Sequence, residues 1–150
     1  MIRELERRDA DACDAIVAGL PEWFGDEVGI ADCAAAVRSQ EGLAAEQDGE
    51  VVGFLTFQVG AGPEEITWMA VRSDKRRNGV GRALVEQLVE RLVDAGSRVL
   101  WVKTLSDRDG PFAPYEETRQ FYLNLGFVRG AELDIWGPDN PAVAFELSLD

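Results

Sequence analysis

Two glycines in a cationic stretch are the residues of this sequence whose types and spacing most directly suggest chemistry. The stretch RRNGVGRALVEQLVERL, residues 76–92, follows the apolar run ITWMAV and places Gly79 and Gly81 where a helix is expected to begin. Glycine at a helix end costs up to about 1 kcal/mol relative to alanine, so a compensating interaction is expected. Backbone N–H groups at a helix N-terminus attract anions, and glycine allows an anion to approach closely. The stretch therefore predicts an anion-binding site.

The charge around these glycines is opposite in sign to that of the whole chain. The 150 residues have a net charge of −13, from 28 acidic and 15 basic side chains. Between residues 72 and 82 the only acid is Asp74, and the cations are Arg72, Lys75, Arg76, Arg77 and Arg82. The overall charge argues against binding to nucleic acid, whereas the local positive charge favours a small anion.

Two common phosphate-binding motifs are excluded at this position. A dinucleotide fingerprint requires a glycine at position 84, where the sequence has Leu84. A P-loop requires Gly-Lys followed by Ser or Thr, which is absent. A pyrophosphate bound without Mg²⁺ chemistry remains, and the alternative is an ordinary loop with a solvated basic patch.

The sequence contains no histidine. This excludes Ser-His-Asp and Cys-His nucleophile systems and nearly every common zinc site, so no metal is expected. The cysteines, Cys13 and Cys33, form no motif and are expected to be buried, reduced thiols. Acid–base chemistry must therefore come from Asp, Glu, Tyr, Cys or Lys side chains.

Hydrophobic periodicity predicts one α+β domain spanning residues 1–150, with mixed strand pairing. Strands are expected at residues 2–5, 43–47, 50–59, 65–71, 98–104, 127–133 and 142–149, with a break at GAGPE, residues 60–64. Helices are expected from Asp9, as the cap, to about Pro21, over residues 30–40, from the glycine-containing stretch to Gly96, and over residues 115–126.

Two of these elements have clear local signals. Asp48-Gly49 predicts a tight hairpin turn between two strands. The third helix has one apolar face, which consists of Leu84, Val85, Leu88, Val89, Leu92 and Val93. No apolar run approaches about 18 residues, and the charged N-terminus lacks a signal peptide's apolar centre. The sequence therefore predicts a cytoplasmic protein without membrane association.

Two motifs resemble signatures of the GCN5-related N-acetyltransferase (GNAT) family. RRNGVG, residues 76–81, resembles the R/Q-x-x-G-x-G/A signature, and TRQFYLNLGF, residues 118–127, resembles a second signature, a helix with Phe-Tyr that ends in Gly-Phe. The motifs occur in the family's order, and the predicted element order matches the family fold along essentially the whole chain. The resemblance implies α/β/α layers, with a mixed central sheet of about seven strands and about four helices.

The resemblance implies acetyl-coenzyme A as the co-substrate of an N-acetyltransferase. The backbone of Met69 and Val71 would lie along its pantetheine arm. The pyrophosphate loop would consist of Arg76, Arg77, Asn78, Gly79, Val80, Gly81, Arg82 and Ala83. Family members often have an asparagine seven residues before the tyrosine of the second motif, and Tyr115 departs from that pattern.

The resemblance also implies two catalytic residues. Tyr122 is at the position of the tyrosine that protonates the departing thiolate, and the alternative is a core aromatic beside Phe121. An acceptor ammonium must lose a proton before it attacks. Glu65 begins the strand at 65–71, as does the catalytic glutamate of some family members, and it should share a face with Thr67 and Met69. Glu64 is the competing base, and a solvent-exposed edge carboxylate is the alternative reading of Glu65.

The resemblance also implies where the acceptor binds, because in family members the segment between the first two helices tends to cover the acceptor side. Here that segment is PEWFGDEVG, residues 21–29. Glu22, Asp26 and Glu27 supply negative charge, and the rings of Trp23 and Phe24 provide faces for a cation. A second loop, residues 105–115, adds Asp107, Asp109, Phe112 and Tyr115.

These residues predict a small cationic amine acceptor, such as a polyamine, an amino-sugar or an amino-acid derivative, although loops of so acidic a chain are often acidic. The competing functions are a non-catalytic acyl-coenzyme A-binding or regulatory module and a structural interaction module. The protein is expected to be a monomer or a homodimer.

Overall fold

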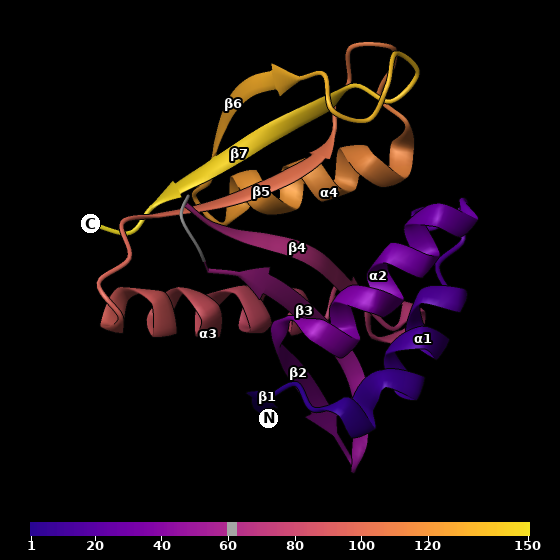
Figure 1. Cartoon of the computed structure of the whole chain (residues 1–150), viewed down its shortest axis with the longest axis vertical. Helices are drawn as coiled ribbons and strands as arrows, with labels where there is room; N and C mark the ends of the chain where they lie inside the picture. The colour runs from indigo at the N-terminus through magenta and orange to yellow at the C-terminus, as the bar shows by residue number, and fades with distance from the viewer. Residues whose placement is uncertain (60–62) are drawn as a thin grey trace.

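The central sheet contains seven strands in the order β1-β2-β3-β4-β5-β7-β6 in a computed structural model, which describes residues 1–59 and 63–150 (Figure 1). The strands are β1 (Ile2–Glu4), β2 (Glu41–Gln47), β3 (Glu50–Gln58), β4 (Glu64–Val71), β5 (Val99–Leu105), β6 (Val128–Leu133) and β7 (Ala142–Ser148). The helices are α1 (Ala10–Ala18), α2 (Glu27–Ser39), α3 (Val80–Asp94) and α4 (Ala113–Asn124), with 3₁₀ turns at Arg7–Asp9 and Ser73–Lys75. Figure 1 shows α1 beside α2, and α4 beside β5 and β7. This confirms the predicted mixed sheet and α+β fold.

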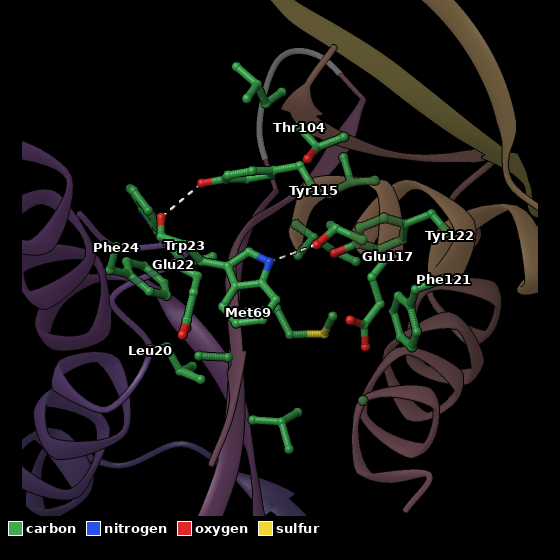
Figure 2. A pocket seen from close by; sticks show the side chains of 18 of the residues that line it. Leu20, Glu22, Trp23, Phe24, Met69, Thr104, Tyr115, Glu117, Phe121 and Tyr122 are labelled. Atoms are coloured by element: carbon green, nitrogen blue, oxygen red, sulfur yellow. Dashed lines mark hydrogen bonds between the residues drawn. The ribbon is translucent and has the colours of Figure 1, made fainter. Parts of the chain in front are cut away.

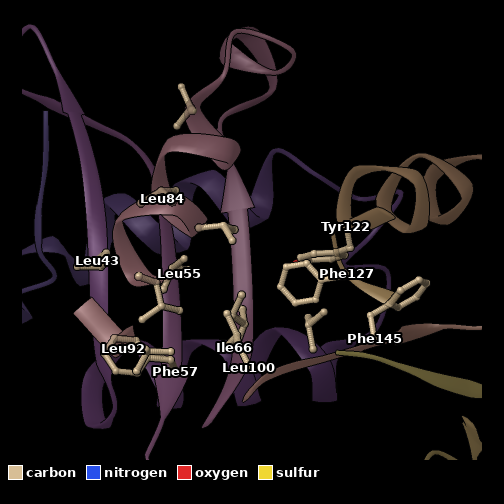
Figure 3. Close-up of a cluster of buried hydrophobic side chains, with 14 of the residues drawn as sticks. Leu43, Leu55, Phe57, Ile66, Leu84, Leu92, Leu100, Tyr122, Phe127 and Phe145 are labelled. Carbon is tan, nitrogen blue, oxygen red and sulfur yellow. The ribbon is translucent and has the colours of Figure 1, made fainter. Parts of the chain in front are cut away.

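Two hydrophobic clusters lie on opposite faces of the sheet. Phe54 and Leu55 are neighbours in β3 and therefore point to opposite faces. Leu55 belongs to the α3 and α4 cluster, with Leu84 and Tyr122 (Figure 3). Phe54 belongs to the α1 and α2 cluster. Of the apolar face predicted for α3, Val93 is an exception, because it is 47% exposed.

A β-bulge at Thr67 changes the direction in which the side chains of β4 point. Thr56 of β3 pairs with Trp68, but Phe57 pairs with Ile66, so Thr67 is an extra residue in β4. Ile66 and Met69 contact the α3 and α4 cluster, whereas Trp68 contacts the α1 and α2 cluster. Strand alternation therefore places Glu65, which precedes Ile66, on the face opposite Met69. The prediction that Glu65 and Met69 share a face is wrong.

Strands β4 and β5 are the only parallel pair among the described strands, and they pair over a short distance. Their paired positions are Glu64 with Leu100, Glu65 with Trp101, and Ile66 with Val102. Both strands continue past these pairs, to Val71 and Leu105, and they separate as they do so (Figure 1). With the intervening helix α3, the two strands form a β-α-β unit.

The turn between β2 and β3 forms as predicted, whereas α1 is capped and ends differently from the prediction. Asp48 and Gly49 have φ angles of 52° and 80°, as a type I′ hairpin turn requires. The Asp9 carboxylate does not cap α1, because it accepts a hydrogen bond from the Glu6 N–H and pairs with Arg3 at 2.8 Å. Helix α1 ends at Ala18, before the expected Pro21.

The second helix begins earlier than predicted. The Asp26 carboxylate accepts hydrogen bonds from the Val28 and Gly29 N–H groups, which starts α2 at Glu27. Cys13 and Cys33 are buried and free, as expected, and burial raises the pKa of each thiol to about 12. Within the described residues, no helix is both long and apolar enough to cross a membrane. Residues 60–62 of the predicted GAGPE break lie outside those described.

Candidate active site

A cavity of about 1510 Å³ lies where β4 and β5 separate, and most of the predicted site residues line it (Figure 2). Its walls come from β4, β5, the start of α3, helix α4 and the segment before α2. It brings together Trp23, Phe24, Asp26, Glu65, Met69, Val71, Arg76, Arg77, Gly79, Val80, Gly81, Arg82, Tyr115 and Tyr122. Of the other predicted residues, Asn78, Ala83, Glu27 and Glu64 do not line it.

The start of α3 presents free backbone donors to this cavity. Gly79 is the N-cap residue, and the first hydrogen bond of the helix runs from the Ala83 N–H to its carbonyl. The N–H groups from Gly79 to Arg82 therefore have no acceptor within the helix. Gly79 has a φ of 83°, which favours glycine, and a Cβ there would meet no atom within 4 Å.

Gly81 is constrained by packing rather than by its backbone conformation. A Cβ atom at Gly81 would lie 3.2 Å from the ring of Phe121, a residue of α4. The small size of Gly81 thus brings the start of α3 against α4. This packing is a second reason for glycine at this position, besides the predicted approach of an anion.

Three of the five cations near α3 already have acidic partners. Arg72 pairs with Asp74 and Glu50, at 2.6 and 3.1 Å. Arg76 and Arg77 both pair with Glu117 of α4, at 3.0 and 3.4 Å.

These pairs reduce the local positive charge that the sequence predicts. The Arg76 guanidinium, and then that of Arg77, lowers the pKa of the Glu117 carboxyl. Lys75 and Arg82 form no ion pair with any residue that the structure describes. The sequence gives no local signal for Glu117, because it lies some forty positions away in the chain.

The open edge of β4 exposes backbone groups of two predicted residues. The Arg72 N–H donates to the Val52 carbonyl of β3, so alternate residues of β4 direct their polar groups toward β3. Met69 and Val71 lie between these residues and direct theirs toward β5. Because β5 has separated from β4 there, these groups face the cavity.

Tyr122 is a core residue that also reaches the cavity. The residue is 4% exposed, and its ring contacts the rings of Phe121, Phe127 and Phe145. Its hydroxyl makes no hydrogen bond to a described residue, although the side chain lines the cavity. Burial raises the pKa of this hydroxyl above its usual range. Tyr122 therefore remains protonated at neutral pH, as a proton donor must be.

Glu65 lies at the point where the strands separate and has a partner that sequence reasoning missed. Its carboxylate is 3.1 Å from Nζ of Lys103 on β5, and both side chains are about one-quarter exposed, at 24% and 28%. Lys103 directly follows Val102, the last β5 residue that pairs with β4. Two signals in the sequence could have identified Lys103. They are the alternation of side chains in the predicted strand at residues 98–104 and its parallel pairing with the strand at residues 65–71.

The segment between α1 and α2, residues 19–26, is docked on α4, and we call it the strap. The Trp23 Nε1 donates to the Pro114 carbonyl and to Thr118 Oγ1, both at 3.1 Å. The Tyr115 hydroxyl donates to the Trp23 carbonyl at 2.8 Å, and Figure 2 shows the two residues reaching toward each other. The Arg76 guanidinium lies 4.0 Å from the centre of the Trp23 ring.

The acceptor side differs in part from the prediction. Asp32 of α2 and the β6–β7 residues Trp136 and Asn140 line the cavity, and sequence reasoning did not identify them. From the predicted second loop, Asp107 pairs instead with Arg129 at 2.7 Å. Asp109 pairs with its neighbour Arg108, and Phe112 is 51% exposed outside the lining.

A family model described as an acetyltransferase (GNAT) domain matches residues 38–129. The chain belongs to the GNAT acetyltransferase family. This confirms the predicted family and the prediction of an acetyltransferase.

One curated GNAT relative is the [ribosomal protein bS18]-alanine N-acetyltransferase of Escherichia coli strain K12. It is 33% identical over 70 residues, which are 47% of this chain and 47% of that protein. The match thus spans about half the length of the curated relative.

Solved GNAT structures match over nearly the whole chain. A protein of the GNAT family from Desulfovibrio desulfuricans superposes with a TM-score of 0.87 at 20% identity, over 100% of this chain and 99% of that one. An aminoglycoside 6'-N-acetyltransferase complexed with coenzyme A gives 0.72 at 20% identity, over 100% and 97%. At these identities the likeness shows the shared fold.

Proposed function

We propose that the protein transfers an acetyl group from acetyl-coenzyme A to a primary amine by direct attack on the thioester. The observation that carries this proposal is the separation of β4 from β5 beyond Ile66. It exposes backbone groups of Met69 and Val71 beside the free N–H groups of α3. These residues fit an elongated ligand with an anionic end.

In this arrangement the pyrophosphate lies against the N–H groups from Gly79 to Arg82, where the positive end of the helix dipole favours it. The pantetheine arm then runs along β4, past Val71 and Met69, toward the point where the strands meet. When bound, this co-substrate supplies the activated acetyl group. Arg82 is available to the phosphates without first giving up an acidic partner among the described residues.

The chemical roles are divided between the two faces of the sheet. Glu65 accepts the acceptor's proton, through a water molecule, on the α1 and α2 face. A backbone N–H of β4 stabilises the negative charge that develops on the carbonyl oxygen. Tyr122, protonated and on the α3 and α4 side, donates a proton to the sulfur.

We favour a small cationic amine as the acceptor. The cavity walls on the acceptor side include the carboxylates of Glu22, Asp26 and Asp32 and the rings of Trp23 and Trp68. The strap, held on α4 by Trp23, lines this side of the cavity, and a concave site with a few converging polar groups suits a small molecule. The similar proteins are named for two different kinds of acceptor, a ribosomal protein in one case and an aminoglycoside in the other.

The proposal is tested by calorimetry with acetyl-coenzyme A, followed by turnover with cationic, neutral and anionic amines and a peptide with a free N-terminus. We expect binding and acetylation of cationic small amines. Binding without turnover of any amine would instead indicate a non-catalytic acyl-coenzyme A-binding module.

The acceptor class has its own matched variants. Asp26→Asn keeps a good helix cap while it removes one cavity charge, and Asp32→Asn removes another. Glu27→Gln removes a charge that does not line the cavity. The first two should raise KM for cationic amines, and Glu27→Gln should not. A preference for anionic amines would contradict the proposed acceptor class.

A further inference from the structure

Lys103 places a primary amine inside the acceptor half of the cavity. Its side chain lines the cavity, and its Nζ is 3.1 Å from the Glu65 carboxylate. The chain has one other lysine, Lys75, on the 3₁₀ turn before α3. The Lys103 amine thus lies beside Glu65, the proposed base, which is where the amine of an external acceptor would have to lie.

The strand geometry brings Lys103 to the end of the path that we propose for the coenzyme arm. That path begins at the start of α3 and runs along β4 from Val71 to Ile66, about 16 Å for five strand residues. Lys103 is the first β5 residue beyond the last paired position, Ile66 with Val102. The inference therefore rests on the proposed function, which directs the thioester toward this point.

Lys103 also lies on the face from which an acceptor is expected to attack. Leu100 and Val102 belong to the α3 and α4 cluster, so alternation places Lys103 on the opposite face, together with Glu65. Tyr122, the proposed donor to the sulfur, belongs to the α3 and α4 cluster. The Lys103 amine and Tyr122 thus lie on opposite sides of the gap between β4 and β5.

We propose that Lys103 is an intramolecular acceptor, and that the protein acetylates it when no external amine fills the cavity. Glu65 takes one proton from the Lys103 ammonium, and the neutral amine attacks the thioester carbonyl. The new C–N bond forms as the C–S bond breaks. Tyr122 protonates the departing thiolate, and the second proton lost by the nitrogen restores Tyr122 through water. The products are acetyl-Lys103 and coenzyme A, with the proton on Glu65 released to solvent.

This modification changes the site that carries it. Acetylation removes the positive charge of Lys103 and with it the ion pair to Glu65. The added acetyl group also occupies space where an acceptor would bind. Acetyl-Lys103 therefore lowers turnover of external amines, so the protein is inhibited when acetyl-coenzyme A is abundant and acceptor is scarce.

The test incubates the full chain with acetyl-coenzyme A that carries a ¹³C-labelled acetyl group, without an acceptor, and follows each lysine by peptide mass spectrometry. We expect label at Lys103 to approach one acetyl per chain, at least ten-fold faster than at Lys75 in the same sample. The first-order rate should not change on ten-fold dilution of the protein. Tyr122→Phe should slow labelling of Lys103 and leave that of Lys75 unchanged.

Two comparisons decide what a negative result means. Lys103→Arg keeps a cation beside Glu65 but cannot be acetylated, so its turnover should not decline during preincubation with acetyl-coenzyme A, whereas wild-type turnover declines as label accumulates. Labelling of Lys103 no faster than Lys75, in a protein that acetylates an external amine, would overturn the inference and leave the proposed function standing. Labelling that slows on dilution would overturn the intramolecular step. Absence of coenzyme binding by calorimetry would overturn the proposed function itself.

Discussion

Tyr122 illustrates how one side chain can serve packing and chemistry together. Its ring fills the core beside Phe127 and Phe145, while its hydroxyl has no hydrogen-bond partner among the described residues and belongs to a cavity-lining side chain. Among the described residues, Arg3 Nε is the one buried side-chain polar atom without a partner, so the Tyr122 hydroxyl is accessible from the cavity and free to donate to a ligand there. The two readings of Tyr122 that the sequence left open are therefore compatible.

Replacing Tyr122 with phenylalanine keeps the ring and removes the proton donor. We expect kcat to fall by about 10²-fold, the low end of general acid–base contributions, because a thiolate is a tolerable leaving group. The affinity for acetyl-coenzyme A and the thermal stability should stay nearly unchanged. Steady-state kinetics under chemistry-limited conditions, with calorimetry on the same variant, check this. An unchanged kcat would leave Tyr122 as a packing residue.

Glu65 and Glu64 form a natural pair for testing the proposed base, because they are neighbours and only Glu65 lines the cavity. Glu65→Gln should lower kcat/KM by about 10² to 10⁴-fold, since an amide cannot accept the acceptor's proton. Glu64→Gln makes the same change outside the cavity and should retain activity. The assignment moves by one residue if the two variants behave the other way round.

Gly49 is a control for Gly79, because both glycines have a left-handed backbone conformation and only Gly79 lines the cavity. Gly79 and Gly49 have φ angles of 83° and 80°, and a Cβ at either would meet no atom within 4 Å. Alanine at either position should cost about 1 to 2 kcal/mol through its left-handed conformation. Only Gly79→Ala should also weaken acetyl-coenzyme A binding, because a side chain there hinders the close approach of the pyrophosphate to the backbone. A loss of about 1 to 2 kcal/mol in binding free energy would raise the Kd roughly five- to thirty-fold. Equal coenzyme affinities for the two variants in calorimetry would contradict the anion-loop role of α3.

At the scale of elements, the strap links the two ends of the proposed site. Trp23 donates to Pro114 and Thr118 of α4 and lies under Arg76, a residue of the proposed pyrophosphate loop. Arg76 in turn pairs with Glu117 of α4. Movement of the strap would therefore change the surroundings of Arg76 in the proposed pyrophosphate loop as well as the acceptor side of the cavity.

Trp23→Phe removes the indole donor but keeps an aromatic face under Arg76. A lost hydrogen bond costs about 1 kcal/mol, so we expect KM for the acceptor to rise about five-fold and the strap to be cut more readily by a protease. Trp101→Phe is the matched control, because the Trp101 indole makes no side-chain hydrogen bond to any described residue and does not line the cavity. Similar acceptor KM values for the two variants would show that the strap does not depend on Trp23.

The elements were predictable where local pattern decides them. The spacing of Leu84, Leu88 and Leu92 predicts α3, and Asp48-Gly49 predicts the turn between β2 and β3. The bulge at Thr67 was not predictable, because one added residue leaves the apolar character of β4 unchanged while it reverses the direction of the side chains that follow.

The composition of the candidate site was predictable where a motif, or the family resemblance that the motifs support, marks it. The glycines of the first motif and Tyr122 of the second, which are predicted site residues, line the cavity. The partners Lys103 and Glu117 come from pairings that are distant in sequence, and neither belongs to a motif. Charge on a loop also proved a weak guide, since Asp107 pairs with Arg129 rather than lining the cavity.

At the scale of the whole molecule, the N-terminal ion pair makes stability depend on pH. Asp9 is 5% exposed, and its hydrogen bond with Arg3 lowers its pKa below the ordinary value of 3.8. A carboxyl with a lowered folded pKa stabilises the fold above its unfolded pKa, and that stability is lost as the pH falls through the folded pKa.

We expect Asp9→Asn to lower the free energy of unfolding by about 2 kcal/mol at pH 7, because the charged partner of Arg3 is lost. The difference from wild type should shrink as the pH falls below about 4, where Asp9 of the unfolded wild type is protonated. Urea unfolding at pH 7 and pH 3 measures this. Asp14→Asn, at the half-exposed pair with Arg38, is the control and should change stability by less than about 1 kcal/mol at either pH. A constant difference across pH would contradict the role of the Asp9 charge.

The separation of β4 and β5 also bears on how this protein avoids association with other chains. A sheet that opens in its middle has two strand edges more than a closed one, and an unpaired edge is a template for intermolecular β-pairing. Here those edges line a cavity whose other walls include the strap and α4. The fold can therefore keep unpaired backbone ready for binding without exposing it to aggregation.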